Sequence, residues 1–268
     1  MPLALSSTMV RVCTGVPLIF LLGLALYMGG WVLFALVALC ACLGQWELQA
    51  MFWAGREQLG GRVLALVLGV VMLALVRLAP QSGVVPMGVA CLGMLLFFLF
   101  RWATRDDEEF ASTAILIGGL CYVPVLLAPV LSFSVQEQLL LVGITICSDT
   151  AAYFCGILFG RHKIWPKVSP KKSVEGSLAG LAGSTLLALL VGTAWGSASP
   201  VAFAALGVGL GGMAQLGDFF ESALKRSRGV KDSGTLLPGH GGILDRIDSL
   251  LFVIPAYAAL SELCTFFN

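Results

Sequence analysis

The sequence predicts an all-α integral membrane protein with about nine transmembrane helices. Three observations predict this fold class: 58% of the 268 residues are hydrophobic, only 12% are charged, and the mean hydropathy is +0.94. Soluble proteins contain roughly 45 to 50% apolar and about 25% charged residues, so this composition cannot cover a water-exposed surface. Helices of about 20 residues would use most of the chain, which leaves no room for a sizeable water-soluble domain.

Apolar runs long enough to cross a bilayer follow one another along the whole chain. They predict spans at residues 12–29, 31–50, 62–79, 84–101, 111–131, 136–159, 177–195, 200–222 and 247–266. Glycine, proline and serine mark short turns between some spans, whereas longer polar loops join the others, at 51–61, 102–110, 161–176 and 223–246. The first run is not expected to be a cleaved signal peptide, because further spans follow it.

The basic residues predict the orientation. With nine spans, Arg77 alone of the sixteen Lys and Arg residues falls on the side opposite the N-terminus. The positive-inside rule then places the N-terminus in the cytoplasm and the C-terminus outside. We expect the membrane to be the plasma (bacterial inner) membrane. We expect the charges to attract anionic lipid headgroups and polyphosphates, except for four that we expect only to set topology: Arg56, Arg62, Arg101 and Arg105.

The chain divides into two parts by its chemistry. Residues 1–135, with spans one to five, are chemically sparse and are expected to be a scaffold. Residues 136–268 contain spans six to nine and the loops 161–176 and 223–246. Because ionisable groups concentrate there at the cytoplasmic ends of spans six, eight and nine, we predict that this part is the catalytic region, with its active site facing the cytoplasm.

Asp149 lies inside the otherwise apolar sixth span. A carboxylate at membrane depth is costly and needs a partner. Helical spacing puts Asp149 and Tyr153 on one face, and we expect that face to point into the bundle interior or a water-filled cavity. The alternative is an interhelical hydrogen-bond anchor.

The loop 161–176 combines basic residues with a helix start. Ser173 is a candidate N-cap for the next helix, which would aim free backbone N–H groups at the place where Lys171 and Lys172 lie. This arrangement suits a phosphate group.

The segment from Asp218 to Asp248 is the richest in chemistry. Asp218, Ser222 and Lys225 fall on one helical face, at offsets of four and seven, and carboxylates then alternate with cations. Mg²⁺ takes oxygen ligands from carboxylates and substrate phosphates, while Lys and Arg neutralise the remaining charge. Glycines around His240 would let backbone N–H groups approach a phosphate. The pattern therefore predicts a polyphosphate site with a divalent metal; the alternative is a salt-bridged surface loop.

This segment resembles the signature of phosphatidate cytidylyltransferases, also called CDP-diacylglycerol synthases. The matching positions run from 222 to 248: Ser222, Lys225, Arg226, Lys231, Asp232, Gly234, Leu237, Pro238, His240, Gly241, Gly242, Asp245, Arg246 and Asp248. Two blocks upstream, Ser148-Asp149-Thr150 and Ser169-Pro170-Lys171-Lys172, are also similar to family motifs. The resemblance runs from about residue 140 to 266.

The resemblance implies that CTP and phosphatidate are converted to CDP-diacylglycerol and pyrophosphate, with one or two Mg²⁺ ions and the option of a monovalent cation. The partners are then CTP, phosphatidate in the bilayer and membrane lipids. A homodimer follows only by analogy with the family, and no nucleic-acid partner is expected.

By hypothesis, Asp218 and Asp245 ligate metal, and Asp248 and Asp149 either ligate it as well or hold the ligands in place. Six cations would neutralise phosphate charge: Lys171, Lys172, Lys225, Arg226, Lys231 and Arg246. His240 would hydrogen-bond a phosphate or protonate the leaving pyrophosphate. The expected substrate-binding set is completed by Ser169, Ser173, Ser222, Asp232, Gly241 and Gly242.

Two rival functions stay open from the sequence. A transporter would also place carboxylates inside the membrane, although here the charges collect at one face and the first half carries no matching set. Another lipid-activating membrane enzyme, such as a polyprenol kinase using CTP or the enzyme making the archaeal ether-lipid counterpart, is the second rival.

Overall fold

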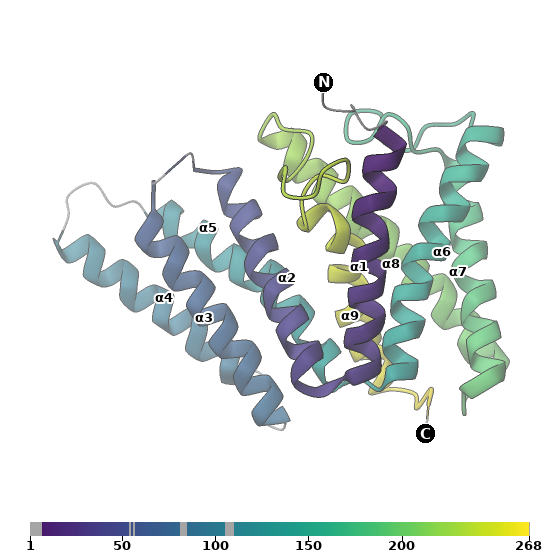
Figure 1. The fold of residues 1–268 in the computed structure, drawn as a ribbon, viewed down its shortest axis with the longest axis horizontal. Helices are drawn as coiled ribbons and strands as arrows, with labels where there is room; N and C mark the ends of the chain where they lie inside the picture. Colours follow the sequence, from purple (N-terminus) through teal and green to yellow (C-terminus); the bar gives the residue numbers. More distant parts are fainter. Residues whose placement is uncertain (1–6, 54, 56, 81–84, 105–109, 268) are drawn as a thin grey trace. The chain divides into compact units, whose positions relative to one another are not determined.

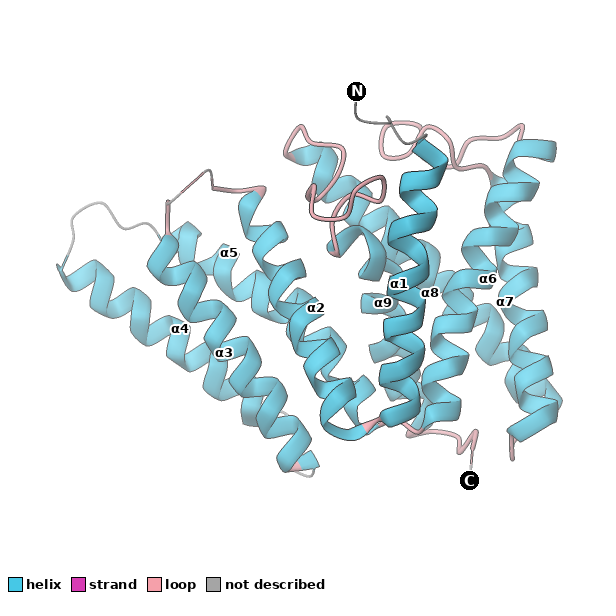
Figure 2. Cartoon of the chain, viewed as in Figure 1, coloured by secondary structure: helices cyan, strands magenta, loops and turns pink. Residues whose placement is uncertain are grey.

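The computed structural model describes residues 7–53, 55, 57–80, 85–104 and 110–267 (Figure 1). Its elements are α1 (Ser7–Met28), α2 (Gly30–Ala50), α3 (Leu59–Leu78), α4 (Val85–Thr104), α5 (Phe110–Leu120), α6 (Val135–Phe159), α7 (Val174–Trp195), α8 (Pro200–Ser227) and α9 (Leu244–Ser261). Within the described ranges no residue belongs to a strand, as Figure 2 shows. The predicted all-α class is confirmed.

Seven of the described helical segments are long and apolar enough to cross a membrane. The described apolar part of α1 is shorter, Cys13–Met28, and α9 carries Asp245, Arg246 and Asp248 at its start. The orientation of the chain in the bilayer stays a prediction. Arg56 and Arg105, on which the orientation partly depends, lie outside the described residues.

The fifth predicted span is one apolar segment, Phe110–Ser132, but it is not one regular helix. After α5 comes a π-helical turn, Cys121–Val125, which contains Pro124, and then a 3₁₀ turn, Ala128–Ser132. Proline has no backbone N–H and its ring clashes with the carbonyl four residues earlier, so the α-helical hydrogen bonds cannot continue through Pro124.

The described chain forms two compact units. The first comprises residues 1–132 together with 232–246, and the second comprises residues 133–231 together with 247–268. The predicted division after residue 135 lies close to the first boundary, but the segment 232–246 packs with the N-terminal helices. The functional division into scaffold and catalytic region stays a prediction.

In the first unit, α3, α4 and α5 pack around a core of Ala65, Met94, Leu116 and Leu120. Arg62, at the start of α3, is buried as well. Its guanidinium carbon lies 3.8 Å from the centroid of the Trp46 ring, and its Nη1 donates to a backbone carbonyl at 3.2 Å. The expectation that Arg62 only sets topology omitted this packing role.

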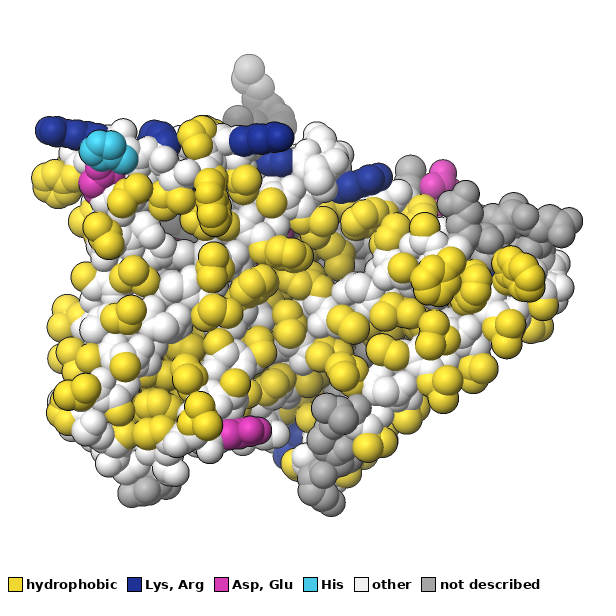
Figure 3. Space-filling model, turned by 180° about the vertical axis from the view of Figure 1, so that it is seen from behind, with side chains coloured by type: hydrophobic (Ala, Val, Ile, Leu, Met, Phe, Trp, Pro, Cys, Tyr) yellow, Lys and Arg dark blue, Asp and Glu magenta, His cyan; other side chains and the backbone are white. Residues whose placement is uncertain are grey.

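In the second unit, small residues let α6, α7 and α8 approach closely. A Cβ on Gly176 would lie 2.7 Å from the Ala152 carbonyl oxygen of α6. The Ser184 hydroxyl of α7 donates to the carbonyl of Gly207 in α8 at 2.9 Å. Lys, Arg and His side chains gather at one end of these helices, and apolar side chains cover their length (Figure 3). The residues of the candidate site in this unit lie at this polar end.

Candidate active site

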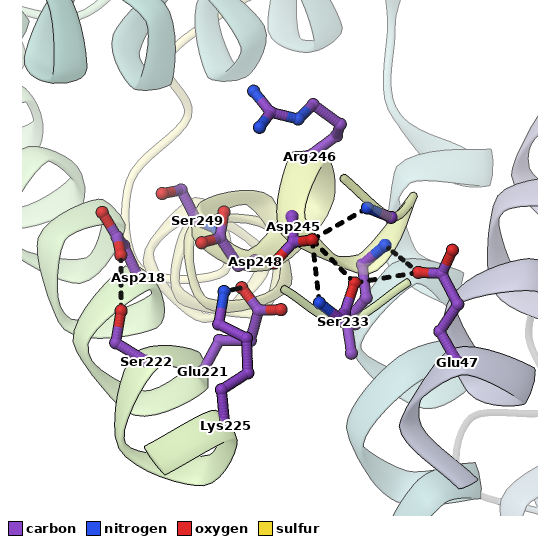
Figure 4. Close-up of polar contacts among 12 residues, drawn as sticks. Glu47, Asp218, Glu221, Ser222, Lys225, Ser233, Asp245, Arg246, Asp248 and Ser249 are labelled. Carbon is purple, nitrogen blue, oxygen red and sulfur yellow. Dashed lines mark hydrogen bonds and ion pairs between the residues drawn. The ribbon is translucent and has the colours of Figure 1, made fainter. Parts of the chain in front are cut away.

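Asp218, near the C-terminal end of α8, is the centre of one polar cluster in the second unit. The Ser222 hydroxyl, one turn later, donates to Asp218 Oδ1 at 3.2 Å, and Figure 4 shows this contact along α8. Lys172 Nζ lies 2.5 Å from Asp218 Oδ2 and 4.1 Å from the centroid of the Phe219 ring. The prediction that Asp218 and Ser222 share one helical face is confirmed. The structure also brings Lys172, from the loop before α7, to the same carboxylate.

A second group of charges lies deeper in the same unit. Glu221 is fully buried, and its Oε2 lies 3.2 Å from Lys225 Nζ, whose side chain is 11% exposed. Asp248, in α9, interacts electrostatically with both Lys225 and Asp218, and Figure 4 shows it beside Glu221. Lys225 was predicted to share a face with Asp218, but its ion pair is with Glu221. A buried ion pair of this kind is costly to break, because the remaining charge has no counterion.

Gly217 allows α8 to approach the backbone of α9. A Cβ at this position would lie 2.5 Å from the Asp248 carbonyl oxygen and 3.1 Å from the Ser249 Cα. No side chain fits there unless the two helices move apart, so glycine is required for the approach that brings Asp218 and Glu221 beside Asp248.

We expect Gly217→Ala to lower the stability of the protein by about 1 to 3 kcal/mol, the typical cost of overpacking. Gly209→Ala is the matched control, because a Cβ at Gly209, in the same helix, would have no neighbour within 4 Å. Alanine is the better helix former by roughly 0.5 to 1 kcal/mol, so the control should be neutral or stabilising. Thermal unfolding of both variants in detergent measures this; equal midpoints would contradict the close approach.

The carboxylates suit Mg²⁺ by chemistry and number. Among the residues that the structure describes, no three His, Cys, Asp or Glu side chains form a group that could hold a metal ion. Asp218 and Asp248, however, are close enough to repel each other, and a divalent cation would relieve that repulsion. Mg²⁺ is usually bound by one or two carboxylates together with substrate phosphates, rather than by a complete cage of protein ligands. The pair therefore fits Mg²⁺ carried with a nucleotide.

Asp149 was expected to face either the bundle interior or a water-filled cavity. Both Asp149 and Tyr153 are exposed on α6, so they do not point into the bundle interior. That this face lines a water-filled cavity stays a prediction. Asp149 belongs to the same unit as Asp218 and Asp248. Its role as a metal ligand stays a prediction.

The loop before α7 is held by local contacts. Ser173 is the N-cap of α7, as predicted, and its hydroxyl accepts from the Gly176 N–H at 3.2 Å. Its side chain is therefore committed to the helix start. Trp165 packs edge-on against Phe219, with ring centroids 4.8 Å apart, which fixes the loop on α8. Lys171 is exposed in this loop, and Ser169 is half-buried.

The segment 232–246 belongs to the first unit and is organised by Asp245. Asp245 Oδ2 accepts the N–H groups of Ser233 at 3.0 Å and Gly242 at 2.8 Å, and it lies 2.9 Å from the Ser233 hydroxyl oxygen. The N–H of Gly242 therefore donates to Asp245, and the substrate-binding role expected of Gly241 and Gly242 stays a prediction. Gly241 adopts a positive φ of 80° in the turn, a conformation that glycine tolerates best.

His240, in the same segment, is held by α1. Its Nδ1 lies 2.7 Å from Thr14 Oγ1, and its backbone carbonyl accepts from Arg246 Nη2 at 2.8 Å. Of the two ring nitrogens, Nδ1 is thus engaged with the protein, which leaves Nε2 as the atom for the predicted contact with a phosphate. Arg246 is exposed, as are three other predicted site residues: Arg226, Lys231 and Asp232.

Sequence reasoning missed Glu47, in α2. This carboxylate is buried and accepts three hydrogen bonds from the segment 232–246; Figure 4 draws the contact with Ser233. The signal was in the sequence, because Glu47 is a lone carboxylate in an apolar run, and that argument was applied only to Asp149. Glu221, Ser233 and Thr14 were also absent from the predicted site.

The described residues form apolar helices long enough to cross a membrane, with paired carboxylates and cations near the helix ends, an arrangement suited to a membrane protein that binds phosphate groups. Residues 9–264 match the model of the Cytidylyltransferase family, and the chain belongs to that family.

Curated relatives support the family at high coverage. A phosphatidate cytidylyltransferase of Thermotoga maritima is 36% identical over 234 residues, which is 83% of this chain and 85% of that protein. The one from Staphylococcus epidermidis is 32% identical over 253 residues, 92% of this chain and 96% of that protein. The one from Bacillus subtilis is 37% identical over 185 residues, 65% and 67% respectively.

Proposed function

We propose that the protein transfers the cytidylyl group of CTP to phosphatidate, which gives CDP-diacylglycerol and pyrophosphate. The observation that carries the proposal is the cluster of Asp218, Glu221 and Asp248 with Lys172 and Lys225, in a chain of the cytidylyltransferase family. Relatives that cover most of the chain carry the name of this activity.

The chemistry needs no nucleophile from the protein. An oxygen of the phosphatidate phosphate attacks the α-phosphorus of CTP; the new P–O bond forms as the bond to the β-phosphate oxygen breaks, and pyrophosphate leaves with the electron pair. The work of the enzyme is positioning and charge neutralisation. Lys172 and Lys225 supply positive charge beside the carboxylates, and the exposed Lys171, Arg226 and Lys231 draw in the polyanions.

We propose that Asp218 and Asp248 hold Mg²⁺ together with the phosphates of CTP. That Asp245 and Asp149 bind metal stays a prediction from the sequence. The bound metal would supply electrostatic stabilisation of the phosphate oxygens. We further propose that the polar end of the helices faces the cytoplasm, where CTP is dissolved, because the basic residues gather there.

The experiment that tests the function uses purified protein in detergent with phosphatidate, Mg²⁺ and CTP labelled on either the α- or the γ-phosphate. We expect α-label to enter the lipid phase and γ-label to leave in pyrophosphate, with no transfer in EDTA. Polyprenol replaces phosphatidate in a parallel sample. Transfer of γ-label to lipid would show a kinase instead, and no transfer by a folded sample would contradict the proposal.

A further inference from the structure

We propose that Glu47 is a positioning residue for the reaction: from α2 it fixes the conformation of the segment 232–246, which carries His240, Asp245 and Arg246. The inference rests on the proposed function for its kinetic part. It assigns a role in the reaction to a helix of the N-terminal half, which was expected to be only a scaffold.

The contacts of Glu47 use both of its carboxylate oxygens. Oε1 accepts the N–H of Ile243 at 3.0 Å, and Oε2 accepts the N–H of Leu244 at 2.9 Å and the hydroxyl of Ser233 at 3.0 Å. The side chain is buried, and so are Ser233 and Leu244. A buried carboxylate with three donors is well satisfied, and loss of its charge would leave those donors without an equivalent acceptor.

Glu47 caps the N-terminus of α9, although capping is usually done by a residue next to the helix start. The first N–H groups of a helix have no acceptor within the helix, and a nearby side chain normally caps them. α9 begins at Leu244, and the two N–H groups at this start donate to Glu47. A negative charge at a helix N-terminus is also favoured by the helix dipole. The position of Glu47 in α2 therefore sets where α9 begins.

The link to the reactive groups passes through Ser233. Its hydroxyl lies between two carboxylates, 3.0 Å from Glu47 Oε2 and 2.9 Å from Asp245 Oδ2. The surrounding backbone leaves no free space: a Cβ on Gly234 would lie 2.7 Å from Glu47 Oε1, and one on Gly242 would overlap both Glu47 and Ser233. A displacement of the Glu47 carboxylate must therefore move Ser233 and, with it, Asp245.

The test compares Glu47→Gln with the matched control Gln49→Met. Glutamine keeps the size of the side chain but turns an NH₂ group toward a backbone N–H donor. Gln49 lies in the same helix, is fully buried, and has no hydrogen-bond partner for its side chain among the described residues. Two readouts are measured on the full-length protein in detergent: hydrogen exchange of the Ile243 and Leu244 amides, and the kinetics of label transfer from CTP.

We expect Glu47→Gln to speed exchange of the two amides and to lower kcat by about 10- to 100-fold, the usual effect of losing a group that orients reactive residues. KM for CTP should change much less, since Lys171, Arg226 and Lys231, which are proposed to attract CTP, lie outside the segment 232–246. Gln49→Met should alter neither readout. A role in stability alone would reduce the folded fraction and leave kcat per folded molecule unchanged.

A double variant tests the route through Ser233. If Glu47 acts on Asp245 through Ser233, then Glu47→Gln combined with Ser233→Ala should be no slower than the slower single variant, whereas independent effects would multiply. Normal turnover in Glu47→Gln, or unchanged amide exchange, would overturn the inference. If the wild-type protein transfers no label, the proposed function fails, and the exchange measurement alone decides whether Glu47 holds the segment.

Discussion

Asp218→Asn is expected to lower turnover by roughly 100- to 1,000-fold, the scale seen when one group that stabilises transition-state charge is removed. Asparagine keeps the oxygen that accepts from Ser222, so the helix contact survives. It removes the negative charge that pairs with Lys172 at 2.5 Å and that we propose binds Mg²⁺. Steady-state kinetics at several Mg²⁺ concentrations measure the loss, and the Mg²⁺ requirement should rise along with it.

Glu262→Gln is the control for this prediction, because Glu262 follows the end of α9, is exposed and lies outside the proposed machinery. It removes one carboxylate of the chain and should retain wild-type turnover. Turnover within a few fold of the wild type in Asp218→Asn would contradict the assignment of Asp218 to the metal. A large loss of turnover with an unchanged Mg²⁺ dependence would instead indicate that Asp218 acts only by positioning Lys172.

Lys225→Met is expected to destabilise the protein by about 3 to 5 kcal/mol, the usual cost of removing one partner from a buried ion pair. Glu221 has no exposed side-chain surface, and it would keep its charge without the ammonium group, beside the further carboxylate of Asp248. Methionine preserves most of the apolar volume of lysine, so the loss reports the charge. Thermal or denaturant unfolding in detergent measures it.

The double variant Glu221→Gln with Lys225→Met separates stability from catalysis. Removing both charges should restore most of the stability, because Glu221 no longer carries a buried charge without a counterion. Turnover should stay low, because Lys225 is proposed to neutralise phosphate charge. Recovery of turnover together with stability would contradict that role and leave Lys225 as a counterion for Glu221.

The helices were predictable because each one is a long apolar run, and the caps and turns obey local rules. Ser173 as the cap of α7 and the contact between Ser222 and Asp218 both follow from spacing within one helix or turn. The interruption at Pro124 was overlooked, since hydropathy averages across it. Two helices extend beyond their predicted spans: α8 continues beyond residue 222 to Ser227, and α9 begins before residue 247, at Leu244. Asp245 and Arg246 are therefore helical.

Pairings between distant segments could not be read from the chain. Lys172 meets Asp218, and Thr14 meets His240, through tertiary packing for which one sequence gives no register. Motif resemblance did not help with Thr14 or Glu47, because it begins at about residue 140. The sequence did contain one general indication, because a carboxylate in an apolar run needs a partner. That argument applies to Glu47 as well as to Asp149.

The hydrogen bond between Glu47 and Ile243 joins residues 196 positions apart, which has a consequence for biosynthesis. At about 5 to 20 residues per second, roughly 10 to 40 s pass between the synthesis of the two residues. During that time α2 is complete while its carboxylate still lacks the donors that it will finally bind. The N-terminal helices are therefore made well before the segment that completes their hydrogen bonds, and a nascent protein arrested before Ser233 would lack all three donors to Glu47.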